Sequence, residues 1–135
     1  MDKTKKKNVR RYILWGVLAV VVAGLAMLPA LARQQAEAGC RLLLIGEMGI
    51  GNTSPSSAVA AVLTGAPVEG VTGIGSGIPS ERVRHKAGLI RRGIAINRPN
   101  PSDAVDVLAK VGGFDIAGLT GVFLGCAENH IPAVV

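Results

Sequence analysis

Residues 40–63, "CRLLLIGEMGIGNTSPSSAVAAVL", combine a short apolar run, a glycine-rich loop and the start of a helix. The mostly apolar residues 40–45 predict a buried strand, of the kind found in parallel sheets. Small apolar residues then follow Ser54 and Pro55, which predicts a helix with Ser54 as its N-cap and Pro55 in its first position. Gly65 is a suitable helix end. The stretch therefore predicts a strand–loop–helix unit of an α/β fold.

Residues 46–52, here called the glycine loop, carry glycines at positions 46, 49 and 51. A helix start offers unpaired N–H groups and partial positive charge, and glycine lets the backbone approach a ligand. The loop therefore indicates a phosphate site, with a plain strand-to-helix turn as the alternative. The spacing matches neither the dinucleotide fingerprint nor the P-loop. Glu47 is placed to accept hydrogen bonds from sugar hydroxyls, or to cap a local turn.

A second glycine cluster, "EGVTGIGSGIP" at 69–79, precedes a basic helix that we expect to end at Gly93. Its basic residues are expected mainly on a solvated face, with one of them near enough to the loop to meet a phosphate. A further helix is predicted from a Ser102 cap to Lys110, and another over 114–129, rich in glycine and alanine for close packing on a sheet. Residues 131–135 begin a strand.

Six of the fifteen basic residues, but only one of the nine acidic residues, lie within residues 1–11. The net charge of +6 therefore describes the N-terminal tail, and with 3% aromatic residues it does not indicate nucleic-acid binding. Residues 12–32 carry no charge and are long enough to span a bilayer, while "ALA" at 30–32 resembles a signal cleavage site. We therefore expect a membrane anchor or signal helix in residues 1–32 and a separate domain in residues 33–135. A buried helix of that domain is the alternative.

Cys40 and Cys126 stand in apolar surroundings, and we expect two free, buried thiols. His85 and His130 are isolated from any ligand cluster, so we expect no metal and no other cofactor. No Ser/His/Asp or Cys/His arrangement indicates a hydrolase.

Three blocks, in order, resemble the nicotinate-nucleotide–dimethylbenzimidazole phosphoribosyltransferases. They are "GEMGIGNTSPSSA" at 46–58, "GIGSGIPSERVRHK" at 73–86 and "DAVDVLAKVGGFDIAGLTGVFLGCAENHIPAVV" at 103–135. The resemblance covers residues 33–135, and the agreement of three ordered blocks makes it specific.

The resemblance implies a fragment of a three-layer α/β/α Rossmann-like fold with a mostly parallel sheet. It also implies transfer of ribose phosphate from nicotinate mononucleotide to dimethylbenzimidazole, giving α-ribazole phosphate for the lower ligand of cobalamin. Family members are typically homodimers that need no metal. By carry-over, the nucleotide site is lined by Glu47, Gly49, Gly51 and Asn52, and the phosphate lies near Gly75, Gly77 and Lys86.

The chain also departs from the family pattern. Ile74 stands where the family has an arginine. The family's catalytic glutamate belongs to a later motif, beyond residue 135, so the resemblance places no catalytic residue within this chain. A membrane-tethered nucleotide-phosphate binder without catalysis is the alternative function. The family's cytoplasmic chemistry conflicts with the predicted membrane or export segment.

Overall fold

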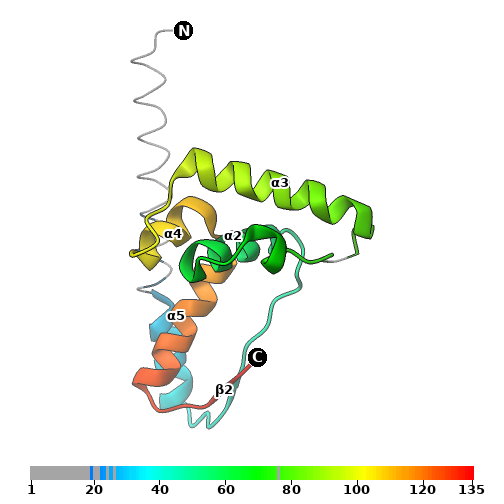
Figure 1. The fold of residues 1–135 in the computed structure, drawn as a ribbon. Helices are drawn as coiled ribbons and strands as arrows, with labels where there is room; N and C mark the ends of the chain where they lie inside the picture. Colours follow the sequence, from blue (N-terminus) through cyan, green and yellow to red (C-terminus); the bar gives the residue numbers. More distant parts are fainter. Residues whose placement is uncertain (1–18, 20–21, 24, 26, 76) are drawn as a thin grey trace, which may run out of the picture.

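The computed structural model describes residue 19, residues 22–23, residue 25, residues 27–75 and residues 77–135. Residues 27–37 are helical and precede the labelled elements. These are β1 (Leu43–Leu44), α2 (Thr53–Thr64), the 3-10 helix η1 (Val68–Val71), α3 (Ser80–Asn97), α4 (Ala104–Val111), α5 (Phe114–Glu128) and β2 (Ala133–Val134). Figure 1 shows α2, α3 and α4 gathered at one end, and α5 with β2 at the other. The predicted mixed α/β class is confirmed.

The strands β1 and β2 pair in parallel, with Leu43 opposite Ala133 and Leu44 opposite Val134. The predicted strand at 40–45 is thus real but shorter than expected. It is also less buried, since Leu44 is 76% exposed. The reason is that the described sheet has only two strands, so no third strand or further layer covers this side chain.

The main hydrophobic core lies between the helix at 27–37, α5 and the small sheet. Ala32, Ile45, Val122 and Cys126 form its buried cluster. Gly125 makes the close approach possible, because a Cβ atom there would lie 2.6 Å from the Cα of Pro29. The glycine and alanine content of α5 therefore serves close packing, here against a helix as well as the sheet. Both thiols are free, with Cys126 buried and Cys40 half-buried.

This packing corrects the prediction of a membrane anchor at residues 12–32. Residues 12–18, 20–21, 24 and 26 lie outside the described residues, but Ala32, at the end of the apolar run, is fully buried against α5. Across the described residues, no helix has the length and apolarity needed to cross a membrane. An apolar run suits a core helix as well as a bilayer, and its described end is used in the core. The proposed division at residue 32 stays a prediction.

The helix boundaries follow local signals, with three of them shifted from the predicted positions. Gly65 ends α2 in the left-handed conformation with φ of 70°, as expected. However, α2 begins at Thr53, so Asn52 takes the N-cap position and Ser54 does not. Helix α3 continues through Gly93 to Asn97, because an interior glycine costs only about 1 kcal/mol relative to alanine.

The start of α4 also differs from the prediction by one residue. Asp103, rather than Ser102, is the N-cap. Its carboxylate accepts hydrogen bonds from the N–H groups of Val105, at 3.0 Å, and Asp106, at 3.1 Å. Gly112 and Gly113 then separate α4 from α5, as the sequence predicted.

Candidate functional site

The glycine loop joins β1 to α2 and relies on two glycines in the left-handed region. Gly49 has φ of 81° and Gly51 has φ of 76°, values that side chains rarely tolerate. Within the loop, the Glu47 carboxylate accepts a hydrogen bond from the Gly49 N–H at 2.6 Å. Glu47 itself is exposed. The middle of the loop is thus shaped locally, by two glycines and one carboxylate, and the loop leads directly into the first turn of α2.

Lys86 connects the second glycine cluster to the start of α2. It lies on α3 and is half-buried. Its Nζ donates to the Thr53 hydroxyl at 3.0 Å and to the Gly73 carbonyl at 3.3 Å. Among the described residues no ion pair involves Lys86, so its charge meets only neutral oxygens. A cation held by neutral groups beside a helix start is a suitable partner for an anion.

Gly75 allows Lys86 and Thr53 to meet. Its φ is 60°, and a Cβ atom added there would lie 2.8 Å from the Thr53 hydroxyl and 3.2 Å from the Lys86 Nζ. Any larger residue at position 75 would therefore push directly against the pair. The start of α2, the residues around Gly73 and Gly75, and α3 come together at this point.

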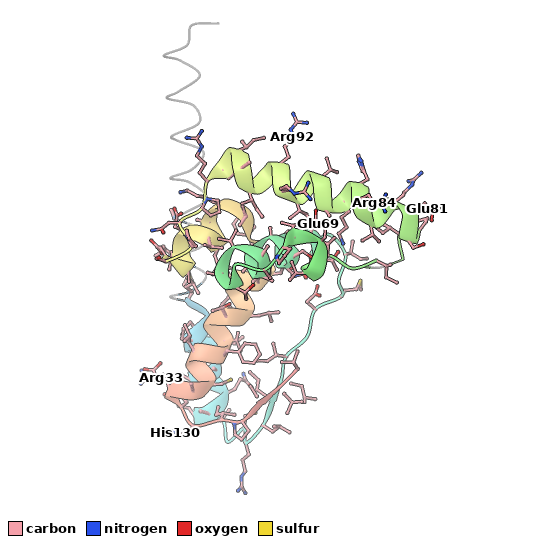
Figure 2. All side chains as sticks on the ribbon, viewed as in Figure 1. Arg33, Glu69, Glu81, Arg84, Arg92 and His130 are labelled. Atoms are coloured by element: carbon pink, nitrogen blue, oxygen red, sulfur yellow. The ribbon has the colours of Figure 1, made fainter. Side chains whose placement is uncertain are left out.

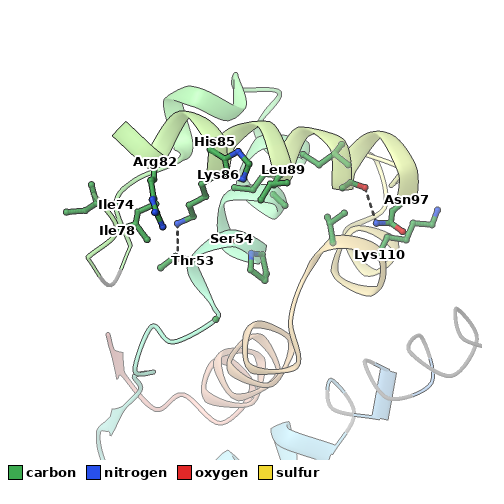
Figure 3. Close-up of a pocket in the computed structure, with 17 residues that line it drawn as sticks. Thr53, Ser54, Ile74, Ile78, Arg82, His85, Lys86, Leu89, Asn97 and Lys110 are labelled. Carbon is green, nitrogen blue, oxygen red and sulfur yellow. Dashed lines mark hydrogen bonds between the residues drawn. The ribbon is translucent and has the colours of Figure 1, made fainter. Parts of the chain in front are cut away.

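A cavity of about 640 Å³, here called the first cavity, opens along α3 between α2 and α4. Arg82, His85 and Lys86 line it at spacings that share one helix face. Figure 3 shows the Arg82 and Lys86 side chains directed toward Thr53, with the Lys86–Thr53 hydrogen bond drawn. The wall of the first cavity is otherwise mainly apolar, with Ala58 and Ile90 among the lining residues. The cavity is thus a mainly apolar hollow, with Arg82 and Lys86 near Thr53 and a further basic residue, Lys110, toward its other end (Figure 3).

A second cavity, of about 330 Å³, is also lined by Thr53 and has a more polar wall. It is lined by Asn52, Thr53, Ser56, Ser57, Ala60, Val71, Gly73 and Gly75. Thr53 lines both cavities, and its hydroxyl accepts the hydrogen bond from Lys86. Two neighbouring cavities that share one hydroxyl can hold different parts of one ligand.

The predicted site residues divide into two groups. Gly51 and Lys86 line the first cavity, whereas Asn52 and Gly75 line the second. The structure places Glu47, Gly49 and Gly77 outside the walls of both cavities.

Sequence reasoning did not assign Thr53 or His85 to the site, although both line the first cavity. The spacing of 82, 85 and 86 on one helix was the signal that could have found the basic face. The remaining basic residues of α3 include Arg84 and Arg92, which are exposed and which Figure 2 shows on the outer side of the helix.

Asn52 is the buried link between the glycine loop and α5. Its Nδ2 donates to a carboxylate oxygen of Asp115 at 2.5 Å, and its Oδ1 accepts from the Ser56 hydroxyl at 2.7 Å. The hydrogen bond from Asn52 holds the pKa of Asp115 below its usual range. Asp115 is therefore ionised at neutral pH.

Comparison with known proteins identifies the class. A family described as Phosphoribosyltransferase matches residues 19–135, and the chain belongs to this family. The relatives make the identification narrower, because they are named nicotinate-nucleotide–dimethylbenzimidazole phosphoribosyltransferase. The one from Desulforamulus reducens is 49% identical over 85% of this chain and 32% of its own length. The one from Clostridium acetobutylicum is 56% identical over 73% of this chain and 28% of its own length. The resemblance predicted from the sequence is confirmed.

A solved structure agrees with the fold. The crystal structure of CobT from Thermus thermophilus matches with a TM-score of 0.75 and 34% identity, over 84% of this chain and 34% of that one. The chain thus spans about a third of the length of these relatives.

Proposed function

We propose that this chain provides the nucleotide-phosphate site of a nicotinate-nucleotide–dimethylbenzimidazole phosphoribosyltransferase. The observation that carries the proposal is Lys86, whose Nζ lies between the Thr53 hydroxyl and the Gly73 carbonyl beside the start of α2. A phosphate bound here meets a lysine charge, a hydroxyl and the helix N–H groups together. The relatives' name supplies the substrates, nicotinate mononucleotide and dimethylbenzimidazole.

The glycine loop is proposed to hold the ribose and to bring the backbone close to the nucleotide. Gly49 and Gly51 supply the left-handed turns, while Gly77, with φ of 112°, does the same for the second cluster. A carboxylate accepts several hydrogen bonds, so Glu47 can contact a ribose hydroxyl while it holds the Gly49 N–H. These contacts would orient the sugar so that its anomeric carbon faces the incoming base.

The proposed reaction exchanges one C–N bond for another. A ring nitrogen of dimethylbenzimidazole attacks the anomeric carbon, the bond to nicotinate breaks, and nicotinate leaves with the bonding electrons. The other ring nitrogen gives up its proton to a general base. The resemblance implies that this base is a glutamate of a motif beyond residue 135. The part played by this chain's own residues is to fix the phosphate and orient the ribose.

Two further features belong to the proposal. We infer that the observed elements form part of a three-layer α/β/α arrangement with a longer parallel sheet, as the resemblance implies. We also infer a homodimer. Light scattering after size-exclusion chromatography tests the dimer directly, since a monomeric mass would exclude it.

The test of the function is calorimetric titration of nicotinate mononucleotide into the full chain and two variants. Lys86→Met removes the proposed phosphate contact, and we expect it to raise the dissociation constant by about tenfold or more. Arg84→Met is the matched control, because it removes one positive charge from the exposed face of the same helix. Circular dichroism on each sample shows whether the variants remain folded.

The outcomes separate the alternatives. Saturable binding that depends on Lys86 and not on Arg84 supports the phosphate site. Addition of dimethylbenzimidazole, followed by chromatography for α-ribazole phosphate, then separates transfer by this chain from binding without catalysis. A folded chain that binds no nicotinate mononucleotide would overturn the proposal.

A further inference from the structure

Asn52 stands at the N-cap of α2, yet its side chain does not cap that helix. An N-cap side chain normally accepts a hydrogen bond from the second or third helical N–H. Here the second residue is Ser54 and the third is Pro55, which has no N–H. Both polar atoms of the Asn52 amide are instead used by Asp115 and Ser56.

We propose that Asp115 is a positioning residue for the phosphate site: by holding Asn52, it fixes the end of the glycine loop so that Thr53 faces Lys86. The inference rests on the proposed function, since it assigns Asp115 a role in that same site. Asp115 lines neither cavity and contacts no proposed ligand, so its effect passes through Asn52.

The geometry of Asn52 favours this role over a general packing role. Asn52 is only 8% exposed, and its contact with Asp115 joins residues 63 positions apart in the sequence. Thr53 follows Asn52 directly and receives the Lys86 hydrogen bond at 3.0 Å. A rotation of the Asn52 backbone would therefore move the Thr53 hydroxyl away from Lys86. It would also free the Asn52 side chain to accept a hydrogen bond from the N–H groups at the start of α2.

The start of α5 is built to present this carboxylate. Asp115 lies in the first turn of α5, where the helix dipole favours an acidic side chain. Gly113 leaves room for it, because a Cβ atom there would press on an Asp115 carboxylate oxygen. The ionised carboxylate then accepts a charge-assisted hydrogen bond from Asn52, which is stronger than a neutral one.

The experiment combines hydrogen–deuterium exchange with titration of nicotinate mononucleotide, both on the full chain. Asp115→Ala removes the acceptor, and we expect faster exchange within residues 46–56 and a dissociation constant raised by about tenfold. Asp115→Asn keeps an acceptor oxygen without the charge, so both effects should be intermediate. Glu128→Ala is the matched control, because it removes an exposed acid from the last turn of the same helix.

Several outcomes would overturn the inference. Exchange within 46–56 that is unchanged in both Asp115 variants would show that the carboxylate does not hold the loop. Exchange that rises evenly along the whole chain would show general destabilisation instead of positioning. If the unaltered chain binds no nicotinate mononucleotide, the proposed function fails, while the exchange comparison still decides whether Asp115 orders the loop.

Discussion

Helices α2 and α4 both begin after a polar residue that ranks among the best N-caps, yet only one start is closed. At α4, the Asp103 side chain accepts hydrogen bonds from two backbone N–H groups. At α2, the Asn52 side chain makes no such bond. Because asparagine and aspartate cap helices about equally well, the residue type does not explain the difference.

The difference comes from what surrounds each cap. Asp103 lies on the surface, and within the described part of the chain its carboxylate has no competing partner of the kind that Asn52 has in Asp115. Pro55 also removes one N–H that Asn52 would otherwise accept. At α4 the first N–H groups have a side-chain acceptor, whereas the start of α2, beside Lys86, has no side-chain cap. This contrast separates a structural helix end from the helix end that we propose to bind phosphate.

The largest effect at the open start of α2 is expected from adding a side chain at position 75. We expect Gly75→Ala to raise the dissociation constant for nicotinate mononucleotide by about tenfold or more, because its Cβ would press on Thr53 and Lys86. Calorimetric titration measures the change. Gly70→Ala is the control, since a Cβ atom there meets nothing within 4 Å. Equal affinities in the two variants would show that the Thr53–Lys86 contact does not contribute to binding.

The matching change at the closed start is Asp103→Ala. We expect it to lower the free energy of unfolding by about 1 kcal/mol, because two N–H groups of α4 lose their acceptor. Urea denaturation measures the loss. Affinity for nicotinate mononucleotide should stay unchanged, since Asp103 lines neither cavity. A large loss of affinity with little loss of stability would reverse the roles assigned to the two helix starts.

Local signals were sufficient to predict much of the fold. Gly65 and the glycines at 112 and 113 end or separate helices through their own backbone properties, so they could be found from the sequence. The Asn52–Asp115 contact could not be predicted, because nothing local links residues 63 positions apart. Ser54 was predicted as the N-cap because a serine before a proline is a typical helix start. Nothing in the sequence indicated that Asn52 holds this position and that its side chain binds Asp115.

The prediction of a membrane anchor at 12–32 was wrong for a different physical reason. A bilayer and a protein core both select uncharged, apolar residues, so length and composition alone favoured the membrane. The described end of this run lies in the protein core because Pro29 and Ala32 fit closely against Gly125. At the site, the resemblance named Gly75 and Lys86, which the structure brings together, but it did not name Thr53 between them.

Low pH should also lower the stability of the α4 start, and we expect a smaller effect than that of Asp103→Ala. Lys110 donates to Asp106 at 2.8 Å, and this hydrogen bond holds the pKa of Asp106 below its ordinary value of 3.8. The carboxylate therefore stabilises the fold above pH 3.8, and this contribution disappears as pH falls through the lower folded-state pKa. Urea denaturation at several pH values should show the free energy of unfolding falling in this acid range.

Lys110→Met provides the comparison for that experiment. Without Lys110, the main cause of the lowered pKa of Asp106 is gone, so the fall in unfolding free energy with acid should become shallower. The other acidic residues titrate in both proteins and cancel in the difference. Identical pH slopes would show that the Asp106–Lys110 pair does not contribute to the stability of this region.

The smallest expected effect belongs to Ser102→Ala, which tests whether the cap of α4 is placed correctly. Ser102 is exposed, and its contact with Asn100 uses its backbone N–H, which alanine keeps. The free energy of unfolding should therefore change by no more than about 0.5 kcal/mol in urea denaturation. If Ser102→Ala instead costs as much as Asp103→Ala, the serine holds the helix start. The closed end of α4 would then not depend on the Asp103 carboxylate, and the contrast with α2 would lose its basis.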